Sequence, residues 1–147
     1  MDSRDAAIRL FVYEEALAGA IPTPAQIGVQ FSLTPQEAGD ALRRLQDDHD
    51  ALVLLPGSSY IWMAEPFSAV ASDYPVLSGN RRWYGNCIWD ALAIAALVGD
   101  PCRIPAVCPQ SGAALDLEVR DGELVRATGV VHFAVPPRRW WESIGFT

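Results

Sequence analysis

The chain has 147 residues, half of them hydrophobic, and a formal net charge of −7 at pH 7. This length is enough for one domain or for two small domains that share a core. No apolar run reaches the roughly 18 residues of a membrane-spanning helix. Because the N-terminus is acidic and leads into no apolar segment, we expect no secretory signal, no membrane partner and a cytoplasmic protein.

Helices are predicted in the N-terminal part of the chain. Apolar positions at three- and four-residue spacing predict an amphipathic helix over residues 4–18. Residues 23–26 and 34–37 each combine an N-cap threonine, a proline at the first helical position and a glutamine or glutamate that completes a capping box. We expect a short helix that ends near Phe31 and a longer one that ends near Asp48.

A hairpin is predicted to follow these helices. Its strands are residues 52–55 and 60–63, and residues 56–59 form the turn. Three helices and a hairpin are typical of a winged-helix domain, which usually binds DNA. However, residues 1–77 contain eleven acidic and four basic side chains, and DNA affinity depends on neutralising phosphates. We therefore expect no nucleic-acid partner and a structural or substrate-covering role.

Strands dominate the rest of the chain. Residues 102–107 are predicted as an edge strand, because Pro105 removes a donor from the hydrogen-bond ladder. Strict alternation over residues 115–119 predicts a half-exposed strand. The most apolar predicted strand is residues 129–135, and a last helical turn is expected over 138–142.

The predicted fold class is therefore α+β. A three-helix, winged-helix-like domain over residues 1–75 precedes a small mixed or antiparallel β-sheet domain over residues 76–147, which carries a cysteine-bearing helix. Because an open sheet edge invites pairing, a homodimer is one alternative to a minimal single-chain domain.

Cys87 lies at the start of the predicted helix, which covers roughly residues 87–98 with Asn86 as N-cap and Gly99 at its end. The orphan N–H groups and the positive end of the helix dipole favour a thiolate there, so we expect a lowered pKa for Cys87, with only a modest net shift because the Asp90 charge opposes it. Asp90 projects from the same face three residues later. The alternative is that the cysteine is a small buried hydrophobe and the aspartate only complements the dipole.

Other candidate site residues are aromatic or imidazole side chains. Trp83, Tyr84 and Trp89 flank the thiol and the carboxylate in sequence and are expected to form an apolar wall. His132 lies on the predicted apolar strand, where a histidine is more often a core residue than a ligand.

The remaining cysteines, Cys102 and Cys108, do not have zinc-finger spacing, and no second pair completes a tetrahedral set. In a reducing compartment we expect thiols rather than disulfides. The sequence contains no glycine-rich phosphate loop and no nucleophile elbow.

Three segments in this order resemble the alkylmercury lyase (organomercurial lyase) family: Asn86-Cys87-Ile88-Trp89-Asp90, Cys108-Pro109-Gln110-Ser111-Gly112 and Val131-His132-Phe133. The resemblance covers nearly the whole chain. It implies an enzyme that needs no cofactor, cleaves a carbon–mercury bond, and releases a hydrocarbon while leaving Hg(II). The implied partner is therefore a small organomercury compound or Hg(II).

The resemblance also implies roles for individual residues. Cys87 would bind the metal through its soft thiolate, Asp90 would donate the proton to the leaving carbon, and Cys108 matches a cysteine with a structural role. The second catalytic cysteine of the family is missing, because residues 128–130 are Thr-Gly-Val. Cys102 is the candidate second metal ligand if its strand lies beside Cys87.

Three functions remain open at this point. The first is a lyase that acts on a carbon–mercury or related carbon–heteroatom bond. The second is a non-catalytic protein that binds a soft metal or organometal through Cys87, with Cys102 or Cys108. The third is a winged-helix regulator that senses such a ligand, and the acidic N-terminal half disfavours it.

Overall fold

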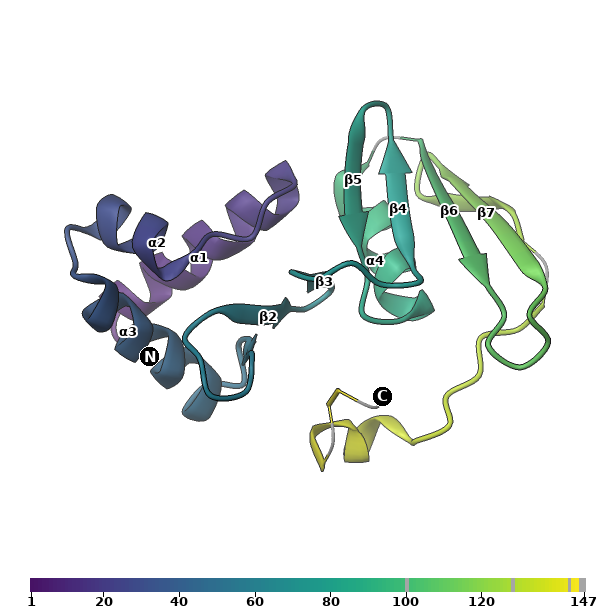
Figure 1. Ribbon diagram of the computed structural model, residues 1–147. Helices are drawn as coiled ribbons and strands as arrows, with labels where there is room; N and C mark the ends of the chain where they lie inside the picture. The colour runs from purple at the N-terminus through teal and green to yellow at the C-terminus, as the bar shows by residue number, and fades with distance from the viewer. Residues whose placement is uncertain (100, 128, 143, 146–147) are drawn as a thin grey trace.

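The computed structural model describes residues 1–99, 101–127, 129–142 and 144–145. It confirms the α+β class, with helices first and antiparallel sheets after them (Figure 1). The helices are α1 (Ser3–Ala18), α2 (Pro24–Phe31), α3 (Pro35–Asp47), α4 (Ile88–Val98) and the 3₁₀ helix η1 (Pro137–Glu142). The strands are β1 (Val53–Leu54), β2 (Ile61–Ala64), β3 (Phe67–Ser68), β4 (Pro75–Ser78), β5 (Arg81–Tyr84), β6 (Cys102–Val107), β7 (Ala114–Arg120) and β8 (Glu123–Arg126). Within the described ranges, no helix is both long and apolar enough to cross a bilayer.

The starts of α2 and α3 form as their sequences predict. Thr23 and Gln26 make a complete capping box at α2, and Thr34 and Glu37 make one at α3. In the second box the Thr34 backbone N–H donates to the Glu37 carboxylate at 2.8 Å. These local contacts satisfy donors that a helix start would otherwise leave without partners.

A buried ion pair ties α1 to α3. Asp5 is 2% exposed, and it accepts two hydrogen bonds from the Arg44 guanidinium at 2.7 and 2.9 Å. Arg44 itself is about half exposed. The paired geometry compensates the Asp5 carboxylate for its loss of water.

The core has two hydrophobic clusters. The first lies among α1, α2, α3 and the small sheet, and includes Ile8, Leu42 and Leu45. The second lies between α4 and the larger sheet, and includes Val76 and Ile94. The division of the chain at residue 75 stays a prediction.

In the described part of the chain, strands form a three-stranded sheet in the order β1-β2-β3 and a five-stranded sheet in the order β5-β4-β6-β7-β8. The prediction of β6 as an edge strand is wrong, because β6 lies between β4 and β7. Pro105 is tolerated there because β4 pairs with β6 only at Leu77 and Arg103, so no donor is needed at the proline.

The predicted strand over residues 129–135 is also wrong, because these residues form no regular element. The stretch follows β8 and pairs with no described strand of the sheet, so no backbone hydrogen bonds to a neighbouring strand keep it extended. Val130 is 93% exposed.

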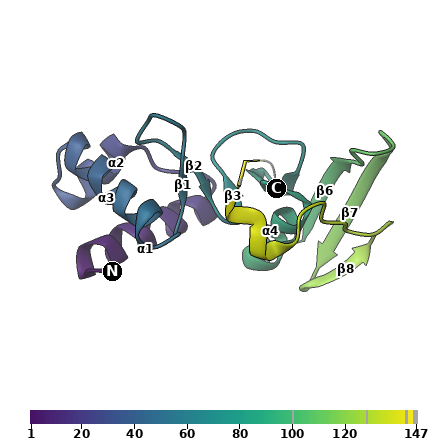
Figure 2. The same ribbon diagram turned by 90° about the horizontal axis from the view of Figure 1, so that it is seen from below.

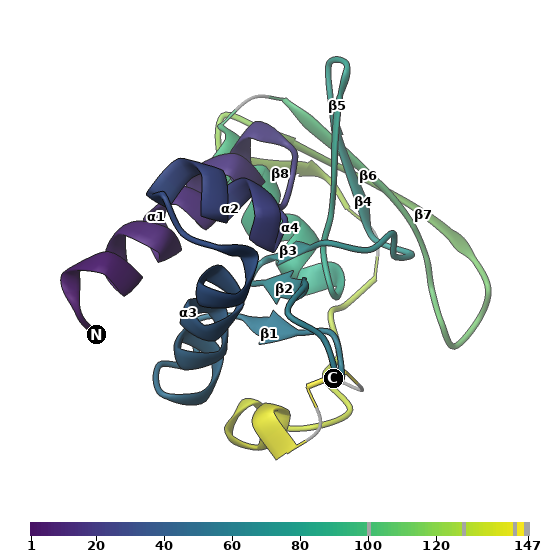
Figure 3. The same ribbon diagram turned by 60° about the vertical axis from the view of Figure 1, so that its left-hand side comes forward.

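The C-terminal segment, yellow in Figure 1, runs back from the larger sheet to the region between the two halves of the chain. Figure 3 shows η1, the yellow helix, below the small sheet, and Figure 2 shows it in front of α4. Trp140 of η1 lines a cavity together with Cys87 and Asp90 from the start of α4. Gly145 lies directly on the ring of Trp62 in β2, where an added Cβ would come within 2.6 Å. The segment therefore covers the place where the small sheet meets the N-terminal end of α4.

Candidate active site at the start of α4

Cys87, and not Asn86, is the N-cap residue of α4, so the predicted cap is off by one residue. Gly85 explains this geometry. A Cβ at Gly85 would lie 2.6 Å from the backbone nitrogen of Ala91 and 2.9 Å from the carbonyl oxygen of Cys87. The chain before the helix thus passes tightly over its first turn, which only a glycine permits.

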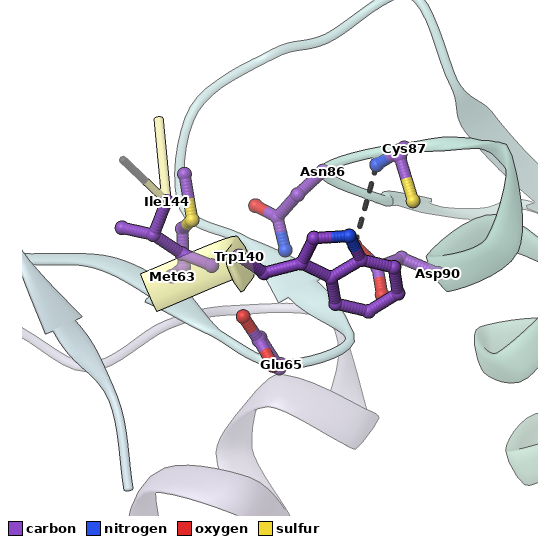
Figure 4. A pocket seen from close by; sticks show the side chains of 7 residues that line it. All are labelled: Met63, Glu65, Asn86, Cys87, Asp90, Trp140 and Ile144. Atoms are coloured by element: carbon purple, nitrogen blue, oxygen red, sulfur yellow. Dashed lines mark hydrogen bonds between the residues drawn. The ribbon is translucent and has the colours of Figure 1, made fainter. Parts of the chain in front are cut away.

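The Cys87 thiol and the Asp90 carboxylate lie side by side, as Figure 4 shows. The Cys87 backbone N–H donates to Asp90 Oδ2 at 3.3 Å. In return, the backbone N–H groups of Trp89 and Asp90 face the Cys87 sulfur. The helix start therefore forms a capping arrangement in which cysteine takes the usual place of serine or threonine.

The pKa of Cys87 is raised, contrary to the prediction from its place at a helix start. Burial is the main cause, and the Asp90 carboxylate raises the pKa further, whereas the facing N–H groups only partly offset both. Desolvation therefore outweighs the helix dipole here.

Burial also raises the pKa of Asp90, and hydrogen bonding from Asn86 and Cys87 offsets part of this effect. Asp90 thus keeps its proton to a higher pH than an exposed aspartate does, which suits a proton donor.

Two cavities of different size meet at Cys87 in the described part of the chain. The smaller one, called the polar cavity for the Glu65, Asn86 and Asp90 side chains that it contains, has a volume of about 30 Å³ and is lined by Met63, Glu65, Asn86, Cys87, Asp90, Trp140 and Ile144. The larger cavity has a volume of about 520 Å³ and a mostly apolar lining from α4, β6, β7 and residues 129–135. Cys87 and Trp140 line both cavities. The thiol therefore lies at the boundary between a carboxyl-containing space and an apolar one.

The predicted aromatic wall forms only in part. Trp83 is 4% exposed in the second core cluster, and its indole N–H donates to carbonyl oxygens of α1 at 3.0 and 3.2 Å. Tyr84 is half-buried at the end of β5 and contributes to the described lining of neither cavity. Trp89 is 53% exposed, but its ring packs edge-on against Phe133 at 6.0 Å. Trp89 thus helps to fasten the C-terminal segment over the site.

His132 is not a core residue, because the strand that would bury it does not form. It is exposed to solvent and lines the apolar cavity. The structure therefore brings His132 and Cys87 to the same cavity from segments that are far apart in the sequence.

The two other cysteines have different environments. Cys102 is 2% exposed in the second core cluster and is not among the described lining residues of either cavity. Cys108 is half-buried and lines the apolar cavity together with Cys87. Hydrogen bonding from the Ser111 side chain, and from the backbone of Ser111 and Gln110, lowers the pKa of Cys108. The family resemblance places its second catalytic cysteine in the region of residues 128–130. Thr128 lies outside the described residues, and Gly129 and Val130 line the apolar cavity.

Glu65 and Trp140 are among the residues of the polar cavity that sequence reasoning missed. Glu65 reaches it from the connection between β2 and β3, and Trp140 reaches it from η1. The signal for Glu65 was a carboxylate directly after an apolar strand, and for Trp140 a tryptophan pair in a chain segment without other periodicity. Neither signal is specific, because both residues reach the site only through tertiary packing.

Among the described residues, no group of three or more His, Cys, Asp and Glu side chains is arranged to hold a metal ion. A metal site with three or more of these side chains as ligands, such as structural zinc, is therefore not formed by the described residues. The cavity-lining thiols suit a soft metal that accepts few ligands.

Comparisons with known proteins show which fold and which family the chain shares. The crystal structure of the mercury-bound form of MerB2 is similar in fold, with a TM-score of 0.67 at 16% sequence identity. The similarity covers 87% of this chain and 61% of that one, so this chain spans about three-fifths of the similar protein. No curated protein matches the chain. The family model described as MerB, alkylmercury lyase, matches residues 67–147, which is more than half of the chain and includes Cys87, Asp90 and the apolar cavity. The chain therefore belongs to the alkylmercury lyase family.

Proposed function

We propose that the protein binds an organomercury compound through Cys87 and cleaves its carbon–mercury bond, with Asp90 as the proton donor. One observation carries this proposal: the Cys87 thiol borders both the polar cavity that holds Asp90 and the large apolar cavity. A compound bound at the sulfur would place its metal at this boundary and its organic group in the apolar space.

The reaction has two steps. First, the sulfur of Cys87 replaces the small thiolate that is bound to mercury in solution, because a soft thiolate prefers a soft metal. The displaced thiolate takes the proton of Cys87 and leaves as a free thiol. The carbon–mercury bond then breaks, and its electron pair stays with the carbon. The carbon takes the proton of the Asp90 carboxyl group and leaves as a hydrocarbon, while Hg(II) remains bonded to Cys87 and Asp90 becomes a carboxylate.

The electrostatics of the site favour this division of roles. Because burial raises the pKa of Asp90, the carboxyl group holds a proton where an exposed one would have lost it. Binding of a metal cation at the sulfur removes the thiol proton, which compensates for the raised pKa of Cys87.

The apolar cavity is large enough to hold a sizeable organic group. Its volume of about 520 Å³ lies within the usual range for small-molecule sites. Leu92, Leu117 and Phe133 contribute apolar walls, and His132 adds one polar group. Aryl and longer alkyl groups should therefore be accepted as readily as methyl.

The second candidate function is soft-metal binding without turnover. It is favoured by the Cys108 thiol, which lines the same cavity as Cys87 and has a lowered pKa. A Cys87–Cys108 pair would release its two thiol protons and hold Hg(II) as a dithiolate, with no proton transfer to carbon. Cys102 is a weaker candidate for the second ligand, because its side chain is packed in the core.

Turnover decides between these functions. Purified protein is incubated with phenylmercury and excess small thiol, and benzene is measured in the headspace. The proposal predicts release by the wild type, loss of release in Asp90→Asn with retained phenylmercury binding, and loss of both in Cys87→Ser. Cys102→Ser serves as the matched cysteine control. Tight binding with no benzene from any variant would favour the second function, and undiminished release from Cys87→Ser would refute both.

A further inference from the structure

The ring of Trp140 borders the space on both sides of the metal-binding thiol. Trp140 and Cys87 line the polar cavity and the apolar cavity alike. Figure 4 shows the flat indole of Trp140 in front of the Asp90 side chain. An organic group that is joined to a metal at the Cys87 sulfur and extends into the apolar cavity would therefore lie against this ring.

Two contacts fix the orientation of the Trp140 ring. Its indole N–H donates to the carbonyl oxygen of Val135 at 2.8 Å. The ring also packs on Phe133, with 5.2 Å between the ring centroids and 47° between the ring planes. Because the one polar group of the indole already has a partner, the ring offers a ligand only its apolar, aromatic surface.

Phe133 connects Trp140 to the helix that carries the thiol. The Phe133 ring contacts the Trp89 ring edge-on, with 6.0 Å between the centroids, and Trp89 follows Cys87 by two residues in α4. Phe133 and Trp140 line the apolar cavity, whereas Trp89 is not among its described lining residues. Three rings in series thus hold the aromatic wall of the cavity in a fixed position relative to the Cys87 sulfur.

Tyr74 adds a third aromatic side chain to the described lining of the apolar cavity. Its carbonyl oxygen accepts a hydrogen bond at 3.0 Å from the N–H of Gly85, which precedes Cys87 by two residues. Many other lining residues are aliphatic, such as Leu92 and Leu117. Aliphatic side chains accept any apolar group, but aromatic rings favour offset or edge-to-face contact with another aromatic ring. The cavity volume does not distinguish an aryl group from a saturated group of equal size, whereas the aromatic lining does.

We propose that Trp140 is the specificity-determining residue of the apolar cavity, and that with Phe133 it selects a flat aromatic group over a saturated group of the same size. This inference rests on the proposed function, because it concerns the organic group of the same substrate. The aryl group contacts the indole ring of Trp140 while the metal is held at Cys87. Each well-placed aromatic contact favours an aryl ligand by about two- to tenfold, so the two rings together favour it by about tenfold.

The first test measures binding of an aromatic probe without any mercury. Benzyl alcohol and its saturated counterpart, cyclohexylmethanol, are titrated into ¹⁵N-labelled protein while NMR follows the indole N–H signals, and the Trp140 signal is assigned from its loss in Trp140→Phe. Hydrophobic transfer alone would favour the saturated alcohol, because it is the more hydrophobic of the two. Benzyl alcohol should nevertheless shift the Trp140 signal with a Kd about three- to tenfold lower.

Trp141 is the internal control for this titration. It is the neighbour of Trp140 in η1, is 50% exposed and is not among the described lining residues of either cavity. Its indole signal should not respond to either alcohol. Equal affinity for the two alcohols, or no response of the Trp140 signal, would overturn the inference.

The second test measures the ratio of kcat/KM for phenylmercury to kcat/KM for cyclohexylmercury, each with excess small thiol. Comparing this ratio between proteins cancels the different intrinsic reactivity of the two carbon–mercury bonds. Trp140→Leu should lower the ratio by about tenfold, Trp140→Phe, which keeps a ring, should lower it less, and the control Trp141→Leu should match the wild type. Equal losses for both substrates in Trp140→Leu would show a merely structural role and overturn the inference.

The two tests separate this inference from the proposed function. Tighter binding of benzyl alcohol at Trp140, with no hydrocarbon released by any of the proteins, would uphold the aryl site and refute the proposed cleavage. Benzene release with an unchanged substrate ratio in Trp140→Leu would refute the role of Trp140 and uphold the cleavage.

Discussion

Gly85→Ala should destabilise the start of α4 and displace Cys87 from Asp90. The added methyl group would lie 2.6 Å from the Ala91 nitrogen and 2.9 Å from the Cys87 carbonyl oxygen. These two atoms make the first backbone hydrogen bond of the helix, at 3.1 Å. Because both are backbone atoms, neither can rotate away, and the chain itself must move.

The expected cost follows from these contacts. Overpacking that shifts backbone costs about 1–3 kcal/mol, and weakening one hydrogen bond adds about 1 kcal/mol. Reduced freedom of the unfolded chain returns about 0.5 kcal/mol, so we expect a net loss of roughly 1.5–3.5 kcal/mol. If cleavage requires the present thiol–carboxyl geometry, a displacement of about 1 Å should lower its rate by about 100-fold.

Gly39→Ala is the matched control. Its Cβ would lie 2.7 Å from Ser59 Oγ, which can rotate away, and 3.0 Å from Ser59 Cβ, which must move by a few tenths of an ångström. Alanine also gains about 1 kcal/mol over glycine within a helix. We therefore expect the stability of Gly39→Ala to stay within about 1 kcal/mol of the wild type, with unchanged benzene release. Urea unfolding with a constant m-value gives both free-energy changes. Wild-type stability and cleavage in Gly85→Ala would refute the described geometry of the helix start.

Further predictions concern the buried ion pair, the thiols and the acidic N-terminal part. Asp5→Ala should lower the free energy of unfolding by about 1.5–3 kcal/mol, and a double-mutant cycle with Arg44→Met in urea should show coupling, whereas purely additive effects would contradict the pair. At neutral pH iodoacetamide should alkylate Cys108 faster than Cys87, because the Cys87 pKa is raised and the Cys108 pKa is lowered. Asp90→Asn should move the pH midpoint of Cys87 alkylation to lower pH, since it removes a negative charge beside the thiol. Peptide mass spectrometry over a range of pH measures this midpoint, and an unchanged midpoint would contradict the prediction. Fluorescence anisotropy with duplex DNA should show no binding at physiological salt, and tight, salt-sensitive binding would contradict the charge argument.

Local signals in the sequence predicted the helices well. The capping boxes at Thr23 and Thr34 define helix starts through contacts that span three residues, so they form regardless of the rest of the fold. The Cys87–Asp90 pair is local in the same sense. The raised pKa of Cys87 was not predictable, because burial depends on the C-terminal segment that packs over the helix start.

Long-range packing accounts for what sequence reasoning missed. Residues 129–135 have the composition of a buried strand, but a strand needs a partner, and composition cannot supply one. Trp83 lies near Cys87 in the sequence, and Cys102 was the candidate for a second metal ligand. Both side chains are buried in the second core cluster instead. Glu65 enters the site from the other sheet, and no pattern along the chain connects it to Asp90.

The central claim is that Cys87 holds mercury while Asp90 delivers a proton to the carbon. The most direct measurement is mass spectrometry of intact and digested protein after one equivalent of phenylmercury, for the wild type and Asp90→Asn. Asp90→Asn should keep the whole phenylmercury group on the peptide that contains Cys87. The wild type should pass through the same adduct and then keep mercury on that peptide without the phenyl group. An adduct on Cys102 or Cys108 with unmodified Cys87, or phenyl loss at equal rates in both proteins, would contradict the claim.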